Sequence, residues 1–114
     1  MRTCARAIHR PGVMNGTERA YSLLLSRRRD AGEISEYFFE DIKLKLGKAC
    51  FYTPDFMVIR TDGRIEMHEV KGFWMDDARV KIKAAADKFP FVFIAAKQKG
   101  KNFEIEIIQE GEIK

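Results

Sequence analysis

The segment FVFIAAK at 91–97, whose first six residues are all apolar, constrains the fold of this chain more than any other stretch. It lacks the polar–apolar alternation of a one-sided strand, which indicates a central strand buried on both faces. A helix is predicted before it at 76–89, with Asp76 as its N-cap, and a strand before that at 64–72. The apolar side of this helix is marked by Ala78, Ile82, Ala85 and Phe89. Such a strand–helix–strand unit is a crossover, so the two strands should run parallel.

Three further strands are predicted. Segment 33–47 reads as a strand that is half-buried, because its second half alternates, with a bulge near Glu40. Segment 51–59 forms the next strand, irregular or at an edge around Pro54, because proline cannot donate to a ladder. The turn signal TDG joins it to the strand that follows. Segment 103–108 alternates again and is predicted as a last, one-sided strand.

The first helix is predicted over 18–32, with Gly32 expected to stop it. Asn15 and Thr17 are its N-cap candidates. One face of this helix carries Ala20, Leu23 and Leu24. The predicted order is therefore α-β-β-β-α-β-β, an α/β fold with a mixed central sheet and helices packed against it.

Length and charge restrict the class of protein. A chain of 114 residues with 46% hydrophobic residues fits one small domain, expected at 15–114 after a basic tail at 1–14. The net charge of +4 favours a polyanionic partner, although many basic domains bind none. No apolar run approaches the roughly 20 residues of a membrane span, and the N-terminus lacks the apolar region of a signal peptide, so no membrane partner is expected.

The cysteines bear on the compartment. Cys4 and Cys50 are too few for a disulfide framework and lack the spacing of a zinc site. An intracellular, reducing compartment is therefore expected, which predicts a cytoplasmic protein.

The hairpin predicted around TDG gathers side chains that can do chemistry. Residues two apart in a strand share a face, so Glu69 and Lys71 should point one way and His68 the other. Positions 55 and 69 are symmetric about Asp62 in the turn, which makes Asp55 and Glu69 near cross-strand neighbours. Directly opposed like charges are destabilising. A hard divalent cation between the two carboxylates would remove that penalty.

Magnesium suits such a pair, since Mg²⁺ takes oxygen ligands, usually one or two carboxylates with waters and substrate phosphate. We expect Asp55 and Glu69 to bind it, with the backbone carbonyl of Val70 as a further ligand. The metal would lower the pKa of a bound water, and Lys71 could orient or deprotonate that water or stabilise a developing oxyanion. The alternative is an inert surface hairpin whose two acids form ordinary salt bridges with Lys71 and Arg64.

Four short motifs then stand in a characteristic order. They are TERAY at 17–21, AGEIS at 31–35, YTPDF at 52–56 and HEVKG at 68–72. As a set they resemble the PD-(D/E)XK nuclease superfamily, and more closely its small phage and prophage members, over about residues 15–109. The resemblance implies a restriction-endonuclease-like α-β-β-β-α-β core.

The resemblance also implies roles for individual residues. Asp55 and Glu69 match the metal-binding acids, and Lys71 matches the catalytic lysine. Glu18 matches an acid that many members bring to the metal site; the residues alone equally allow a first-turn Glu that complements the helix dipole. Glu40 stands where relatives often carry Gln, and it is left outside the predicted site.

Contacts to a nucleic acid are expected beside this site. Arg79, Lys81 and Lys83 open the second helix and could grip DNA phosphates. Trp74 follows the catalytic strand and is expected to stack on an unpaired base.

The expected function is that of an endonuclease that uses Mg²⁺, with Mn²⁺ able to substitute, to hydrolyse phosphodiester bonds of DNA. Because so small a domain offers little surface for reading sequence, selectivity for branched DNA or Holliday junctions is expected, with a homodimer as the assembly. The setting would be phage DNA processing and recombination in the host cytoplasm. Two alternatives stay open: a non-catalytic DNA-binding or assembly module that keeps the fold, and an RNA nuclease with the same site chemistry.

Overall fold

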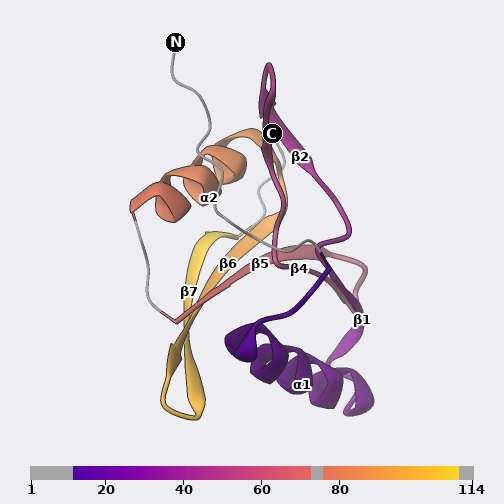
Figure 1. The fold of residues 1–114 in the computed structure, drawn as a ribbon. Helices are drawn as coiled ribbons and strands as arrows, with labels where there is room; N and C mark the ends of the chain where they lie inside the picture. Colours follow the sequence, from indigo (N-terminus) through magenta and orange to yellow (C-terminus); the bar gives the residue numbers. More distant parts are fainter. Residues whose placement is uncertain (1–11, 73–75, 111–114) are drawn as a thin grey trace.

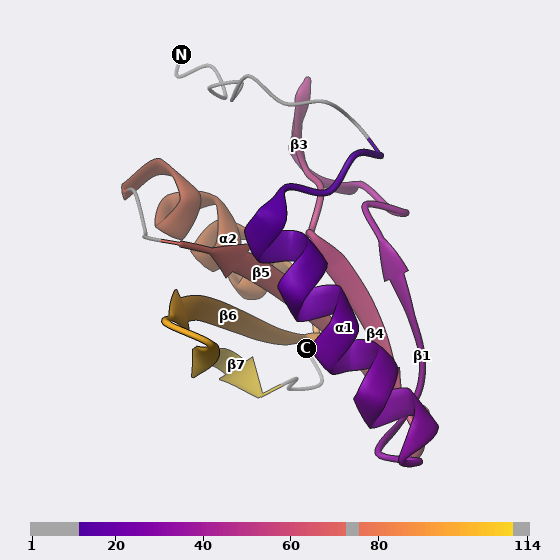
Figure 2. The ribbon, with the colours of Figure 1, turned by 60° about the horizontal axis from the view of Figure 1, so that its bottom comes forward.

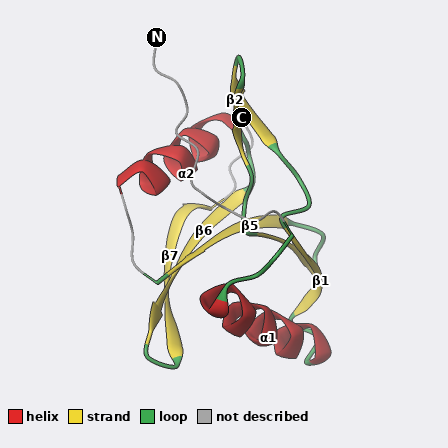
Figure 3. Cartoon of the chain, viewed as in Figure 1, coloured by secondary structure: helices red, strands yellow, loops and turns green. Residues whose placement is uncertain are grey.

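The computed structural model describes residues 12–72 and 76–110. Two helices and seven strands form in this part of the chain (Figure 1 and Figure 3). In chain order they are α1 (Gly16–Asp30), β1 (Ile34–Phe39), β2 (Leu44–Gly47), β3 (Cys50–Tyr52), β4 (Phe56–Arg60), β5 (Ile65–Lys71), α2 (Asp76–Lys88), β6 (Val92–Lys99) and β7 (Asn102–Glu110).

Five of these strands form one mixed sheet in the order β1-β4-β5-β6-β7. Strands β5 and β6, on either side of α2 in the sequence, pair in parallel, which confirms the predicted crossover. The other neighbours in the sheet pair antiparallel. Strands β2 and β3 pair only with each other and form a separate hairpin. The predicted α/β fold with a mixed sheet is therefore confirmed.

The two helices cover opposite faces of the sheet (Figure 2). The core on the α1 side consists of Tyr21, Leu25, Ile34, Phe56, Val58, Val70 and Ala96. The core on the α2 side consists of Leu44, Tyr52, Met67, Ile82, Ala85, Ala86 and Phe93. Side chains alternate along a strand, so β5 contributes Val70 to one core and Met67 to the other, and both of its faces are buried.

Helix α1 begins and ends with well-formed caps. Asn15 and Glu18 form a reciprocal capping box. At the other end Gly32 has φ 78°, its N–H bonds to the carbonyl of Arg29, and the next N–H bonds to Arg28, as in a Schellman motif. The predicted stop at Gly32 is confirmed. The predicted apolar face was wrong: Leu23 is 54% exposed, and the buried residues of the helix are Glu18, Tyr21 and Leu25.

Two predicted strands are each broken in two. Segment 33–47 divides into β1 and β2 because the backbone turns at Glu40, whose φ is 48°. Segment 51–59 divides into β3 and β4 around Pro54, which has no N–H to donate to a ladder. The hairpin register is as predicted, since Phe56 pairs with His68 and Ile59 with Ile65, both symmetric about Asp62. The breaks direct β2 and β3 away from the sheet, toward α2.

Some expectations concern other parts of the chain. Trp74 and the basic tail up to residue 11 lie outside the described residues. Neither described helix is long and apolar enough to cross a membrane. Cys50 is disulfide-bonded, whereas the sequence analysis predicted no disulfide framework and a reducing compartment.

Candidate active site

Asp55 lies where the ladder between β4 and β5 ends. If the pairing continued past Phe56 and His68, Val70 would face Pro54. Instead, the N–H of Val70 donates to Oδ2 of Asp55 at 2.7 Å. On the other side, the N–H of Glu40 donates to the backbone carbonyl of Asp55 at 2.9 Å. Asp55 is therefore held between the end of β1 and β5, and it is only 6% exposed.

Helix α1 brings Glu18 to the same place. The capping box fixes its carboxylate, because Oε1 accepts from the N–H of Asn15 at 2.9 Å. Thr17, the other N-cap candidate, instead donates its hydroxyl to Gln98 at 2.9 Å and so ties the start of the helix to β6. Glu18 is 3% exposed. Its observed role in the capping box and its predicted place beside Asp55 are thus compatible, since one carboxylate has two oxygens.

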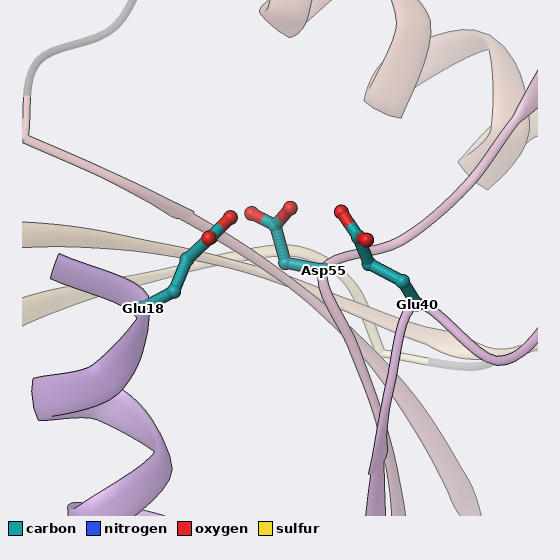
Figure 4. Close-up of side chains that lie close together, drawn as sticks. All are labelled: Glu18, Glu40 and Asp55. Carbon is teal, nitrogen blue, oxygen red and sulfur yellow. The ribbon is translucent and has the colours of Figure 1, made fainter. Parts of the chain in front are cut away.

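Glu40 completes a group of three acids. Ligand atoms of Glu18, Glu40 and Asp55 all lie within 4.8 Å of one another, and the three side chains point toward one another from α1, the end of β1 and the loop before β4 (Figure 4). The φ of 48° at Glu40 is uncommon for a residue other than glycine and costs on the order of 1–3 kcal/mol. The N–H of Gly12 donates to Glu40 Oε1 at 2.8 Å.

Glu69 and Lys71 lie beside this group on β5. The hydroxyl of Tyr52 donates to Glu69 Oε1 at 2.7 Å, and Lys71 Nζ lies 3.1 Å from Glu69 Oε2. Glu69 is 6% exposed, whereas the side chain of Lys71 is 36% exposed. Because Asp55 and Glu69 are both buried, the alternative of an inert surface hairpin does not describe them.

The electrostatics of the site centre on Asp55. Burial raises the pKa of this carboxyl well above its ordinary value, and the negative charge of Glu69 raises it further. Lys71 and the N–H of Val70 oppose this shift without cancelling it. The ionised form of Asp55 is therefore disfavoured in the metal-free site, and a cation bound beside it would stabilise that form.

Lys71 and Tyr52 respond to the same carboxylates. Burial by itself lowers the pKa of Lys71, but the negative charges of Glu69 and Asp55 outweigh it, and the pKa rises above its ordinary value. Burial raises the pKa of Tyr52 well above its ordinary value, and the charge of Glu69 adds to the rise. Lys71 is accordingly an ammonium and Tyr52 a neutral hydrogen-bond donor at physiological pH.

His68 points to the other face of β5, as predicted. Its Nε2 lies 2.7 Å from Glu66 Oε1, and its Nδ1 lies 2.6 Å from the hydroxyl of Tyr21. A carboxylate can only accept, so Nε2 carries the proton and Nδ1 accepts from Tyr21. Burial lowers the pKa of His68, although Glu66 opposes the shift. This network of a neutral histidine, a tyrosine and a carboxylate joins β5 to α1, the helix that carries Glu18.

The predicted phosphate contacts lie on α2. Arg79 bonds to both carboxylate oxygens of Glu106 on β7, at 3.1 and 3.0 Å. Lys81 donates to the backbone carbonyl of Phe51 at 3.3 Å. Lys83 is exposed. Their contact with DNA remains a prediction, as does the role of the Val70 carbonyl, and Trp74 lies outside the described residues.

Two residues of the site were not predicted from the sequence. Glu40 was placed outside it, although the suspected bulge in 33–47 marked the position where the strand turns. Tyr52 is buried at 5% exposure, and a buried tyrosine hydroxyl usually finds a polar partner. Its place three residues before Asp55 is the signal that could have suggested Glu69 as that partner.

No protein-family model matches this sequence, and neither a curated protein nor a solved structure matches it. The resemblance to PD-(D/E)XK nucleases therefore stays a prediction, and the function has to be argued from the site itself.

Proposed function

We propose that this protein is a divalent-metal-dependent endonuclease that hydrolyses phosphodiester bonds of DNA. The observation that carries the proposal is the group of Glu18, Glu40 and Asp55, whose ligand atoms lie within 4.8 Å of one another, with Lys71 nearby on β5. Glu18 and Asp55 are buried, and Glu40 is partly buried. Several carboxylates are not buried close together in an ordinary core without a compensating positive charge.

The donor set fits a hard cation. It consists of carboxylate oxygens from three separate elements, and oxygen is the ligand that Mg²⁺ and Mn²⁺ prefer. Glu18, Glu40 and Asp55 would hold the ion, and we keep Glu69 and the Val70 carbonyl as proposed ligands. When bound, Mg²⁺ supplies Lewis-acid stabilisation of charge on the scissile phosphate and activation of water.

The protein's own groups prepare the site for this reaction. Tyr52 and Lys71 hold the two oxygens of Glu69, which fixes the carboxylate in one orientation. The raised pKa of Lys71 favours an ammonium that stabilises negative charge developing on the phosphate, rather than a base that removes a proton from water. The half-exposed Lys71 side chain can reach a substrate from this position.

The fold is consistent with this chemistry. Five of the described strands lie between the two helices, and three of them, β1, β4 and β5, belong to the main sheet. With the separate β2–β3 hairpin set aside, the order α1-β1-β4-β5-α2-β6 supports a restriction-endonuclease-like α-β-β-β-α-β core, which we propose as its class. The net charge of +4 suits a polyanionic substrate. For so small a domain we propose selectivity for branched DNA, including Holliday junctions, with action as a homodimer in phage DNA recombination in the cytoplasm. The proposed DNA selectivity, dimer and phage setting rest on analogy with nucleases of the proposed fold class.

A cleavage panel tests the proposal. Labelled linear duplex, single strand, flap, fork and four-way junction are incubated with the protein in Mg²⁺, Mn²⁺ or EDTA. We expect metal-dependent cleavage, fastest on a branched DNA, and a loss of about 100- to 1,000-fold in rate for Lys71→Ala. Asp55→Asn should abolish cleavage. Glu104→Gln is the matched control, because Glu104 is an exposed acid paired with Lys99 on the β6–β7 hairpin.

The same panel separates the alternatives. Cleavage of RNA but not DNA would indicate an RNA nuclease. DNA binding without cleavage, together with unchanged Trp74 fluorescence on metal addition, would indicate a non-catalytic binding module. Wild-type cleavage rates in Asp55→Asn would show that this acid group is not the active site.

A further inference from the structure

The β2–β3 hairpin projects from the body of the fold (Figure 1). Its inner side packs on α2, since Leu44 and Tyr52 belong to the same buried core as Ile82. Leu44 and Tyr52 are also cross-strand partners, so the pairing itself sets which side of the hairpin faces inward. The alternating partners therefore face outward.

The outer side is basic and carries one aromatic ring. Lys45 pairs across the hairpin with Phe51, which is 44% exposed. Lys43 precedes β2 and Lys48 occupies the turn, and all three lysines are exposed. Residues 42–52 include no Asp or Glu. We call this set of Lys43, Lys45, Lys48 and Phe51 the hairpin face. Among the described residues, Phe51 is the only aromatic side chain in the set of exposed large hydrophobic residues, and it lies among these lysines.

The hairpin face is connected to the candidate active site through the residues that follow Phe51. Phe51 is followed by Tyr52, whose hydroxyl bonds to Glu69, and Asp55 comes three residues later. Lys81 of α2 donates to the backbone carbonyl of Phe51 and brings a further cation to the base of the hairpin. A strand held along the hairpin face would thus lead to the site where we propose cleavage.

The chemistry of the hairpin face identifies its partner. Lysines contact phosphates without regard to sequence. An aromatic side chain in a basic groove stacks on bases, and this requires a base whose face is uncovered. In a duplex the base faces are stacked on one another, so Phe51 suits an unpaired base.

We propose that the hairpin face binds a single-stranded segment of DNA, with Phe51 stacked on a base and the three lysines on the phosphates. This proposal rests on the function proposed above and narrows it to DNA that offers an unpaired segment beside the cut. A flap or an open junction contains such a segment.

Binding is measured by fluorescence anisotropy in EDTA, so that cleavage does not contribute. The probes are a labelled oligo-dT single strand and a duplex of equal length. For Phe51→Ala we expect binding of the single strand to weaken about 5- to 100-fold and binding of the duplex to change little. Phe51→Tyr keeps a ring for stacking and should restore the affinity. Both variants should melt within a few degrees of wild type, because the ring is exposed.

Salt dependence tests the lysines. For Lys45→Ala the slope of log K against log salt with the single strand should fall in magnitude by about 0.7. Lys101→Ala is the matched control, an exposed lysine in the β6–β7 turn, and its slope should equal that of wild type. Equal single-strand affinity of Phe51→Ala and wild type, or an equal slope change in Lys101→Ala, would overturn the proposal.

The two proposals fail in different ways. If wild type binds the single strand through Phe51 but cuts nothing in Mg²⁺ or Mn²⁺, the hairpin face stands and the nuclease function falls. If wild type cuts, and Phe51→Ala binds and cuts flaps as wild type does, the nuclease function stands and the hairpin face falls.

Discussion

The carboxylate of Asp55 accepts a hydrogen bond from the backbone N–H of Val70 at 2.7 Å, at the point where β4 and β5 cease to pair. A side chain thus takes the place that a backbone carbonyl would have in a continuing ladder. The contact satisfies a buried donor and fixes an acid at the opening between two strands. It also leaves the second oxygen of Asp55 for another partner, which we propose is a metal ion.

Asp55→Asn should stabilise the metal-free protein at neutral pH while it abolishes activity. The pKa of Asp55 is raised by burial and by Glu69, so the stability linked to its proton is present at low pH and is lost as pH rises through the folded value. The amide oxygen of asparagine can still accept from Val70. We expect a gain of about 0.5–2 kcal/mol in the free energy of unfolding at pH 7 in EDTA.

Thermal melts in EDTA from pH 4 to pH 8 measure this effect, and the gain over wild type should grow with pH. Added Mg²⁺ should raise the melting temperature of wild type and leave that of Asp55→Asn unchanged. A variant that is less stable than wild type at pH 7 would contradict the account of Asp55 as a destabilising buried charge.

Tyr52→Phe should weaken metal binding and cleavage about 10- to 100-fold, because it removes the hydroxyl that orients Glu69. Mn²⁺ affinity measured by calorimetry reports the change without a substrate. Tyr37→Phe is the control, since the Tyr37 hydroxyl faces Ser22 at 3.5 Å and does not touch the acids. Equal loss of Mn²⁺ affinity in both variants would point to a general effect on the fold.

In urea melts, the free energy of unfolding of Glu40→Gly should exceed that of Glu40→Ala by about 1 kcal/mol, although both variants lose the carboxylate. The reason is the φ of 48° at this position, which glycine adopts without strain. At the neighbouring Asp41, where φ is not positive, the order should reverse and alanine should be the more stable replacement. If alanine is favoured at both positions, the backbone at Glu40 stores no strain.

His68→Gln should lower the free energy of unfolding by about 1–3 kcal/mol at pH 7.5, because it disturbs a buried network with Glu66 and Tyr21. Burial lowers the pKa of His68, so the unfolded chain binds the extra proton and wild-type stability falls as pH drops below 6.5. Burial raises the pKa of Glu66, but the hydrogen bond with His68 and the nearby positive charges outweigh burial and lower it below its ordinary value, so the ionised carboxylate is favoured.

Denaturant unfolding at pH 7.5 and pH 5.5 checks this. Wild type should lose more stability between the two pH values than His68→Gln does. Identical losses would mean that His68 is not the group responsible for the pH dependence in this interval.

Much of the site was predictable because strand geometry is local. The period of two placed Glu69 and Lys71 on one face and His68 on the other. The TDG turn fixed the register that pairs Phe56 with His68, and Asp55 and Glu69 are the next residues beyond that pair. The segment at 91–97 and the helix before it likewise determined the parallel crossover.

Local patterns in the sequence were therefore enough to predict the pairing of β4 with β5, the parallel pairing of β5 with β6, and the nearness of Asp55 to Glu69. The tertiary structure decided the rest. Glu18 and Glu40 reach Asp55 only because α1 docks across the sheet with Tyr21 and Leu25 inward and because the backbone turns at Glu40. Helix docking depends on packing against distant strands, and a positive φ at a glutamate has no local signal, so neither follows from periodicity.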